Sequence, residues 1–214
     1  MRSDTLIVVP MKDPARAKTR LRGVLGPRET ARLARHLFDR TLGLLLDLRA
    51  ADPMPVFDLA VVTGHGGIAQ VATDLGLLVI EERADATLSQ AIDDAARAAV
   101  SAGYRRLCIL PADLAVPDPA DVRRLVTHPL PARGLALCPS NDYGTNALIA
   151  APPDVIAFAY GPKSFHAHRA AAEARGLTPE VLPLESLRWD IDSSADLAEL
   201  RQVAPEALNF EASS

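Results

Sequence analysis

Short apolar runs alternate along the first part of the chain with longer segments of helical periodicity. Four runs predict strands, at Leu6–Pro10, Asp58–Thr63, Leu77–Ile80 and Arg106–Leu110. The segments that follow them predict helices that begin near Pro27, run from the glycine-rich Gly64–Gly67 to about Leu75, and cover Leu88–Val100 and Asp118–Val126. Strands that alternate with helices at these lengths indicate a parallel sheet layered by helices, with right-handed connections.

The first helix is the clearest of these segments. Pro27 suits the first turn of a helix. One apolar face at helical spacing contains Leu33, Leu37, Leu44 and Leu48. The stretch Ala51–Pro55 contains two prolines and ends the helix. Before it, the fully apolar Leu6–Pro10 predicts a central strand that is buried on both faces.

The alternation changes after Pro131. Two short strand candidates, Leu135–Cys138 and Asn146–Ala150, are separated by a polar turn that is too short for a crossover helix, so they predict an antiparallel extension of the sheet. A helix over Ser164–Arg175, a strand over Glu180–Leu184 and a helix over Asp196–Val203 follow. Without a repeat or a linker, we expect residues 1–214 to form a single α/β domain.

The composition is that of an ordinary globular protein. Hydrophobic residues make up 49% of the 214 residues, which excludes a disordered chain. Two cysteines exclude a disulfide scaffold, and no run approaches the roughly 18 apolar residues of a membrane span. Because no signal peptide precedes the first strand, we expect a cytoplasmic protein. The long apolar helix face also permits a homodimer.

Charge is unevenly distributed along a chain whose formal net charge is only −4. Between Lys12 and Arg35 there are eight basic residues against two acidic ones, so the remainder is strongly acidic. A local excess of positive charge favours an anionic partner. No aromatic residue lies in this range to stack on bases, which argues against nucleic acid and for a small anion.

The basic residues lie where a ligand is expected. In an open parallel sheet, ligands bind beyond the carboxyl ends of the strands. The loop after the first strand, Met11–Gly23, carries five basic residues, which are Lys12, Arg16, Lys18, Arg20 and Arg22. The loop after the fourth strand carries Asp113. A basic loop opposite a carboxylate suits a nucleoside triphosphate, because the cations contact phosphate oxygens while carboxylates hold Mg²⁺.

Asp190 and Asp192 add two more carboxylates. Alternation along an extended segment places both on one face, with Ile191 pointing into the core. Two carboxylates about 4 Å apart repel by roughly 4 kcal/mol at an effective dielectric constant of 20, so such a pair favours a cation between them. With Asp113 they offer three oxygen ligands for one or two Mg²⁺ ions. The alternative is that Asp192, with the two serines after it, caps the last helix.

Five groups of motifs, in order along nearly the whole chain, resemble one family. They are Val9–Lys12 with Ala17–Leu21, Leu110–Leu114, Gly144–Leu148, Gly161–Phe165 with His168, and Asp190–Asp192 with Asp196–Leu197. Pro-Ala-Asp is common among nucleotidyltransferases, whereas Gly-Thr-Asn-Ala-Leu followed by Gly-Pro-x-Ser is much more specific. On these motifs the chain resembles the phospholactate/phosphoenolpyruvate guanylyltransferases of deazaflavin coenzyme F(420) biosynthesis. The resemblance implies their Rossmann-like nucleotide-diphospho-sugar transferase fold.

The resemblance also implies a role for each matching residue. The nucleotide GTP would be bound by Pro10, Lys12, Lys18 and Arg20, of which the three basic residues would hold its triphosphate. The catalytic residues would be Lys18, Arg20 and Asp113. Mg²⁺ would be held by Asp113, Asp190 and Asp192. A small phosphorylated acid (phosphoenolpyruvate, 2-phospho-L-lactate or 3-phospho-D-glycerate) would be bound by Thr145, Gly161, Lys163, Ser164 and His168. The positive end of the helix that starts at Ser164 would add to this anion site.

Two positions depart from the family pattern. Lys163 replaces the second glycine of the usual Gly-Pro-Gly-Ser, which introduces a cation into the acid pocket. Thr87-Leu88-Ser89 stands where relatives carry Gly-Leu-Asn, in a segment that the resemblance implies faces the nucleotide. The fold by itself leaves three alternatives open: another nucleotidyltransferase, a glycosyltransferase, or a non-catalytic nucleotide-binding module.

Overall fold

A single sheet forms the centre of the described structure. In the computed structural model, which describes residues 3–51 and 57–212, seven strands form this sheet in the order β3-β2-β1-β4-β6-β5-β7. The strands are β1 (Thr5–Pro10), β2 (Asp58–Thr63), β3 (Leu78–Glu81), β4 (Arg106–Ile109), β5 (Gly134–Pro139), β6 (Thr145–Ala151) and β7 (Glu180–Val181). Residues 5–9 of β1 are buried between β2 and β4, as the fully apolar run predicted.

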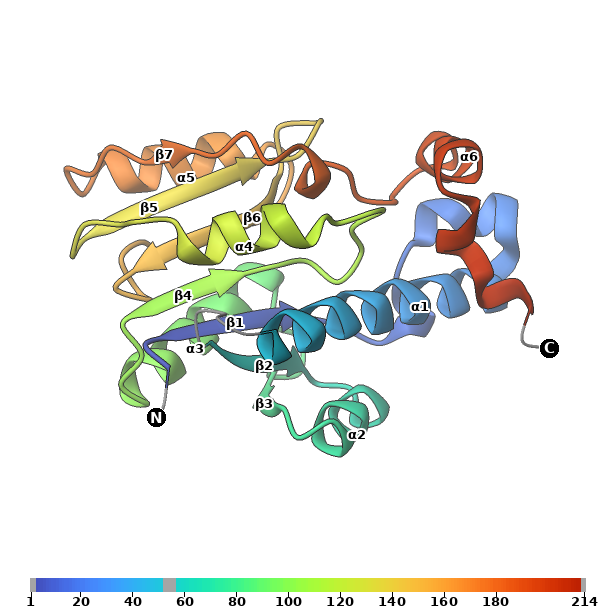
Figure 1. Cartoon of the computed structure of the whole chain (residues 1–214), viewed down its shortest axis with the longest axis horizontal. Helices are drawn as coiled ribbons and strands as arrows, with labels where there is room; N and C mark the ends of the chain where they lie inside the picture. The colour runs from blue at the N-terminus through green and yellow to red at the C-terminus, as the bar shows by residue number, and fades with distance from the viewer. Residues whose placement is uncertain (1–2, 52–56, 213–214) are drawn as a thin grey trace.

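Pairing within the sheet is parallel except at β6. Strand β1 pairs with β2 and β4, β2 pairs with β3, and β5 pairs with β7, all in parallel. Strand β6 runs antiparallel to both of its neighbours, β4 and β5. The predicted parallel sheet with an antiparallel extension is therefore confirmed. The first residues of β6 consequently lie at the edge of the sheet where β1 and β4 end (Figure 1).

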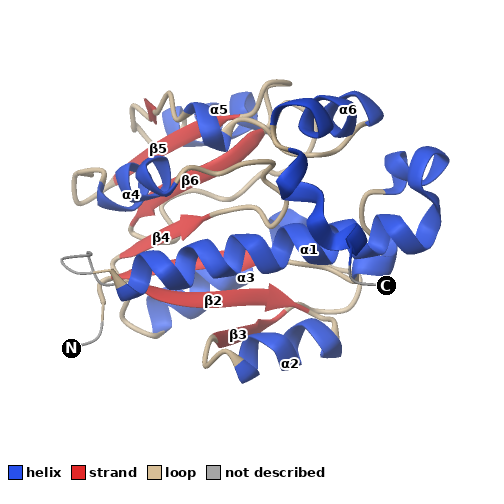
Figure 2. Ribbon diagram, turned by 45° about the vertical axis from the view of Figure 1, so that its right-hand side comes forward, coloured by secondary structure: helices blue, strands red, loops and turns tan. Residues whose placement is uncertain are grey.

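Helices cover both faces of the sheet, as Figure 1 and Figure 2 show. They are α1 (Arg22–Ala50), α2 (Gly66–Asp74), α3 (Leu88–Ser101), α4 (Pro119–Thr127), α5 (Ser164–Glu173) and α6 (Ser194–Val203). Helices α1, α2 and α4 share a buried cluster with Ile7 and Val9 of β1, whereas α3 and α5 share the opposite cluster with Leu6 and Val8. Alternate residues of β1 thus pack on opposite layers, which explains why the strand is apolar throughout.

A third apolar cluster lies beyond the ends of β1 and β4. The beginning of α1, helix α6 and the 3-10 helix Pro205–Ala212 meet there around Leu21, Leu37 and Ile191. In Figure 1 these elements lie at the right-hand end of the molecule, beside the C-terminus. It anchors Ile191, and with it the two flanking aspartates, at the edge of the sheet where ligands are expected.

One predicted strand is shorter than expected. The expected strand Glu180–Leu184 is reduced to two residues. Leu182 N–H still donates to Leu137 O at 2.9 Å, but Leu184 N–H donates back to Leu182 O at 2.9 Å instead of continuing the ladder with β5. The loop after β1, in contrast, contains two short 3-10 helices that its pattern did not predict, Pro14–Arg16 and Thr19–Leu21. These turns fix the backbone on both sides of Lys18.

Helix α1 confirms the first predicted helix, with small differences. Gly26, with φ of 76°, separates a short first turn from the continuous helix that begins at Pro27. On the apolar face Leu44 is only half-buried, while the adjacent Leu45 is fully buried. The helix ends before the predicted break Ala51–Pro55, which beyond its first residue lies outside the described residues. None of the described helices is long and apolar enough to cross a bilayer.

Candidate active site

Two segments far apart in the sequence pair at the edge of the sheet. The segment after β4 runs antiparallel to the segment before α6: Ala115 N–H donates to Trp189 O at 2.9 Å, and Ile191 N–H donates to Asp113 O at 3.2 Å. Ile191 is fully buried, as its place between two aspartates predicted. The side chains of the two flanking aspartates therefore lie on the opposite face of this segment, next to Asp113.

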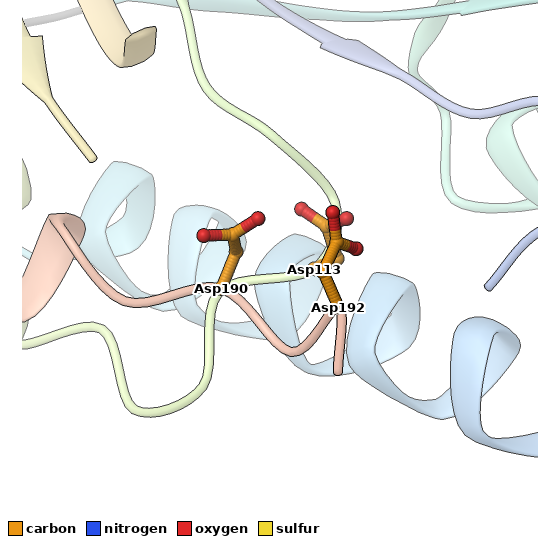
Figure 3. Close-up of side chains that lie close together, drawn as sticks. All are labelled: Asp113, Asp190 and Asp192. Carbon is orange, nitrogen blue, oxygen red and sulfur yellow. The ribbon is translucent and has the colours of Figure 1, made fainter. Parts of the chain in front are cut away.

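Asp113, Asp190 and Asp192 form one acidic cluster (Figure 3). One carboxylate oxygen of each lies within 4.8 Å of the other two. Burial, together with the carboxylates of Asp113 and Asp192, raises the pKa of Asp190 to about 6. The Lys18 ammonium and the Asn146 amide, which donates to Asp190 Oδ1 at 3.3 Å, oppose this rise. The structure thus brings together the three aspartates that the sequence analysis grouped.

Lys18 lies within the acidic cluster. Its ammonium donates to Asp113 Oδ2 at 2.5 Å and to Asp192 Oδ1 at 2.8 Å, and its side chain is only 4% exposed. Burial lowers the pKa of Lys18, but the Asp113 and Asp192 carboxylates outweigh burial and raise that pKa above its ordinary value. The Lys18 backbone is left-handed, with φ of 50°. We expected Lys18 opposite Asp113, but the sequence did not indicate a position between two carboxylates.

Helix α6 is capped without the carboxylate of Asp192. Ser193 Oγ accepts from Asp196 N–H at 3.2 Å, and Asp196 Oδ2 accepts from Ser193 N–H at 2.6 Å, which is a reciprocal capping box. Asp192 contributes only its backbone N–H, which donates to Asp196 at 3.1 Å. The alternative in which Asp192 and the two serines after it cap this helix therefore holds for Ser193 and is wrong for Asp192, whose carboxylate belongs to the acidic cluster.

A buried polar network lies beside the acidic cluster. Thr145, the first residue of β6, and Ser164, the first residue of α5, bring their hydroxyl oxygens to 3.2 Å. His168, one turn further along α5, places Nδ1 2.9 Å from Thr145 Oγ1 and accepts at Nε2 from Ala159 N–H at 3.0 Å. The residue after Thr145 is Asn146, which contacts the acidic cluster. The start of β6 therefore joins the hydroxyl pair to the aspartates.

The backbone that leads into α5 favours glycine at two positions. Gly161 has φ of 147° and Lys163 has φ of 56°. Ser164 N–H donates to Gly161 O at 3.1 Å, so this turn leads directly to the hydroxyl pair. Lys163 is exposed and occupies the position where the family pattern carries glycine. The left-handed backbone explains that glycine, and it makes a lysine there unusual.

The partners of the Lys12 ammonium are outside the acidic cluster. Lys12 follows Pro10, the last residue of β1, and its ammonium donates to Ala86 O at 2.8 Å and lies 3.0 Å from Glu82 Oε1. Both partners belong to the connection after β3. Lys12 and Lys18, which the sequence analysis assigned to one phosphate-binding loop, thus have different side-chain partners.

Arg20 lies close to the turn between β5 and β6. It is exposed, and its charge acts on Asp142, whose pKa is lowered mainly by hydrogen bonds from Ser140 and from Gly144 N–H. A Cβ at Gly144 would approach Ser140 Oγ to 2.6 Å, which explains the glycine of this motif. Arg20 thus lies near the turn that leads into the hydroxyl pair.

Two residues at the start of α3 have roles that we did not predict. Thr87 caps α3 in a capping box with Gln90, a Thr-x-x-Gln pattern that is readable in the sequence. Ser89 Oγ accepts from Tyr160 N–H at 2.8 Å, which ties α3 to the residues just before Gly161. The long-range partner of Ser89 has no counterpart in local sequence, so only the tertiary structure reveals it.

The comparison with known proteins follows the same motifs. Residues 5–203 match the family described as guanylyl transferase CofC like. The chain belongs to this family. A 3-phospho-D-glycerate guanylyltransferase of Colwellia psychrerythraea is 37% identical over 193 residues, which are 90% of this chain and 89% of the relative. A phosphoenolpyruvate guanylyltransferase of Sphaerobacter thermophilus is 36% identical over 207 residues, 94% of each chain.

A solved structure supports the fold of this CofC-like protein. The structure, from Desulfovibrio desulfuricans G20 and described as a candidate nucleotide-diphospho-sugar transferase, has a TM-score of 0.73 at 20% identity and covers 98% of this chain and 95% of its own. At this identity the likeness shows the fold, which is the expected one. Family membership makes the chain a nucleotidyltransferase, and thereby decides against the glycosyltransferase and the non-catalytic module.

Proposed function

We propose that this CofC-like protein transfers the guanylyl group of GTP to the phosphate of a three-carbon acid, with release of pyrophosphate. One observation carries the proposal. Asn146 donates to Asp190 of the acidic cluster, while the preceding Thr145 belongs to the buried hydroxyl pair. A cation-binding group and an anion-binding group are thus adjacent, as the approach of two anionic substrates requires. The activities of the two relatives support the same reaction.

The acidic cluster fits Mg²⁺ by the chemistry of its donors. Its three carboxylates are hard oxygen ligands, with one oxygen of each within 4.8 Å of the others. Repulsion between them contributes to the raised pKa of Asp190, about 6, and a divalent cation relieves that repulsion. Asp113, Asp190 and Asp192 would hold the ion, which when bound supplies charge neutralisation at the phosphate oxygens.

Lys18 supplies a further positive charge at the same place. Its ammonium contacts two of the three carboxylates, so it competes with a divalent cation for the same oxygens. Released from the carboxylates, this ammonium can contact the triphosphate and stabilise the charge on the departing pyrophosphate. Arg20, exposed on the same loop, adds a second cation. Lys12 would contact the nucleotide from the side of β3.

The reaction is a single displacement in which the chain's own residues position the substrates. A phosphate oxygen of the acid attacks the α-phosphorus of GTP, the bond to the bridging oxygen breaks, and pyrophosphate leaves with that electron pair. The nucleophile is already an anion at neutral pH, so no strong general base is required. Thr145 and Ser164 hold the acid together with the positive end of α5. The product joins acid and guanosine through a diphosphate, as in deazaflavin coenzyme biosynthesis.

Among the three candidate acids, Lys163 favours 3-phospho-D-glycerate. Its exposed side chain follows Gly161 and precedes Ser164, so it brings a cation to the start of the acid pocket. The carboxylate of 3-phospho-D-glycerate is one carbon farther from the phosphate than that of phosphoenolpyruvate, which suits a more distant cation. The 37% identical relative acts on the same acid.

Pyrophosphate release tests the proposal. The purified protein is incubated with Mg²⁺, with each of the four common ribonucleoside triphosphates, and with or without each of the three acids. We expect rapid release only when GTP and an acid are both present, with the highest rate for 3-phospho-D-glycerate. Release that is equal for all four nucleotides, or that does not depend on an acid, contradicts the proposal. The Asp190→Asn variant provides the control for contaminating activity.

A further inference from the structure

His168 contacts the hydroxyl pair Thr145–Ser164 but has no role in the proposed reaction described above. His168 is fully buried, and Thr145 and Ser164 are 7% and 3% exposed. We expected His168 to line the acid pocket, but a side chain with no exposed surface reaches a ligand only through its neighbours. The neighbour that it contacts on the side of the pocket is Thr145, at 2.9 Å.

The hydrogen bonds of His168 determine where its proton is. A backbone N–H only donates, so the 3.0 Å contact between Ala159 N and Nε2 requires a lone pair on Nε2. The ring proton is then on Nδ1, and the ring donates to Thr145 Oγ1. Burial is consistent with this neutral form, because it lowers the pKa of His168 to about 4.

The donor to His168 is itself held in place. Ala159 lies between two residues whose backbone N–H groups donate to side chains of α3: Phe158 to Asp93 at 2.9 Å, and Tyr160 to Ser89 at 2.8 Å. The rings of Phe158 and Tyr160 also approach the imidazole edge-on, with centroids 6.1 and 4.9 Å away. The segment 158–160 therefore fixes both the position of the ring and its protonation state.

The direction of the bond from His168 decides what the hydroxyl pair can offer to a ligand. Thr145 and Ser164 carry one hydroxyl proton each, and the 3.2 Å bond between them uses one of the two. Because His168 donates, it takes neither proton, and one hydroxyl proton remains to point away from the network. A ring protonated on Nε2 instead would accept that proton, and the pair would present only lone pairs to a ligand.

We propose that His168 is a positioning residue that keeps the Thr145–Ser164 pair as a hydrogen-bond donor to an oxyanion of the acid substrate. The inference rests on the proposed function, since it takes the acid to bind at this pair. A carboxylate or phosphate only accepts hydrogen bonds, so a pair without an outward proton would repel it. The role of His168 therefore concerns the acid and not GTP.

The protonation state is tested first, without reference to activity. In protein labelled with nitrogen-15 histidine, comparison with the His168→Gln variant assigns the ring signals of His168. We expect a neutral ring protonated on Nδ1 at neutral pH. A ring protonated on Nε2, or a charged imidazolium at pH 7, overturns the proposal.

Steady-state kinetics tests the consequence for the acid. His168→Leu removes both hydrogen bonds, whereas His168→Gln preserves their direction, because the amide oxygen can accept from Ala159 and the amide NH₂ can donate to Thr145. We expect His168→Leu to raise KM for the acid roughly 10- to 100-fold, the range for a lost hydrogen bond to a charged group, with KM for GTP nearly unchanged. His168→Gln should restore most of the loss. The exposed His166 of the same helix gives a matched control, His166→Leu.

A double-mutant cycle separates positioning from a general structural effect. If His168 acts through Thr145, His168→Leu should add little to KM for the acid once Thr145→Val has removed the hydroxyl. An equal increase in both backgrounds, or a parallel rise in KM for GTP, overturns the proposal. If the wild-type protein releases no pyrophosphate with any of the three acids, that result overturns the proposed function and, with it, the role inferred for His168.

Discussion

A histidine that is buried in its neutral form makes the stability of the protein depend on pH. Burial lowers the pKa of His168 to about 4, whereas an imidazole in the unfolded chain keeps its ordinary value of about 6.5. Between these two values the unfolded chain binds a proton that the folded chain does not. The free energy of unfolding therefore falls as pH decreases through this window, and the effect vanishes above it.

The size of this effect follows from the two pKa values. A pKa difference of about 2.5, at roughly 1.36 kcal/mol per pKa unit, corresponds to about 3 kcal/mol between pH 6.5 and pH 4. The ring is fully buried, so solvent does not screen it. His168→Gln keeps hydrogen-bonding groups at this position but cannot titrate, so the variant should lack this loss of stability.

Urea unfolding of both proteins between pH 4 and pH 7.5 measures the effect. The relevant quantity is the difference in unfolding free energy between wild type and His168→Gln, because the titration of every other group, including Asp190, cancels in it. We expect the wild type to lose about 3 kcal/mol relative to the variant over this range. A difference that stays constant with pH would refute a neutral, buried His168.

Three further predictions concern the site and its entrance. Asp190→Asn relieves repulsion among three carboxylates, so after treatment with EDTA the variant should have a higher Tm than wild type in calorimetry at pH 7.5. It should also release no pyrophosphate. A lower Tm contradicts the repulsion. Lys18→Met should lower kcat/KM for GTP about 10²- to 10³-fold in the pyrophosphate assay, and an unchanged value removes this ammonium from the reaction. Lys163→Gly should raise the free energy of unfolding in urea by about 1 kcal/mol, because glycine adopts φ of 56° without strain; a loss of stability argues against strain at this position.

The layered sheet could be predicted because its strands carry the signal themselves. Strand β1 packs on helices through both faces, so an apolar run marks it, and the short turn between β5 and β6 allows only an antiparallel pair. The 3-10 helices around Lys18 gave no such signal, since the local backbone there depends on contacts with distant segments. Glu180–Leu184 was predicted too long, because its apolar pattern does not show that Leu184 N–H turns back to Leu182 O instead of pairing with β5.

The candidate site could be predicted only in part. Asp113 follows β4, so its place at the ligand-binding edge of the sheet could be predicted, and alternation placed Asp190 and Asp192 on one face. The backbone pairing between these two segments, which brings the three carboxylates together, had no signal in the spacing. The sequence did not show which cation lies among the aspartates. Lys18, whose backbone is left-handed, contacts two of them, while Lys12 on the same loop contacts the connection after β3. Side-chain partners on distant loops depend on the tertiary structure, not on spacing along the chain.

The identity of the product tests the central claim most directly. Phosphorus-31 NMR of a reaction that contains GTP, Mg²⁺, the protein and 3-phospho-D-glycerate distinguishes a new diphosphate diester from unreacted nucleotide. We predict that the signals of a diphosphate joining guanosine to the acid appear together with an equal amount of pyrophosphate, and that neither appears with Asp190→Asn. The reaction is repeated with each of the other two acids. If all three reactions give guanosine monophosphate and pyrophosphate but no diester, the protein hydrolyses GTP instead of transferring the guanylyl group, which would contradict the account.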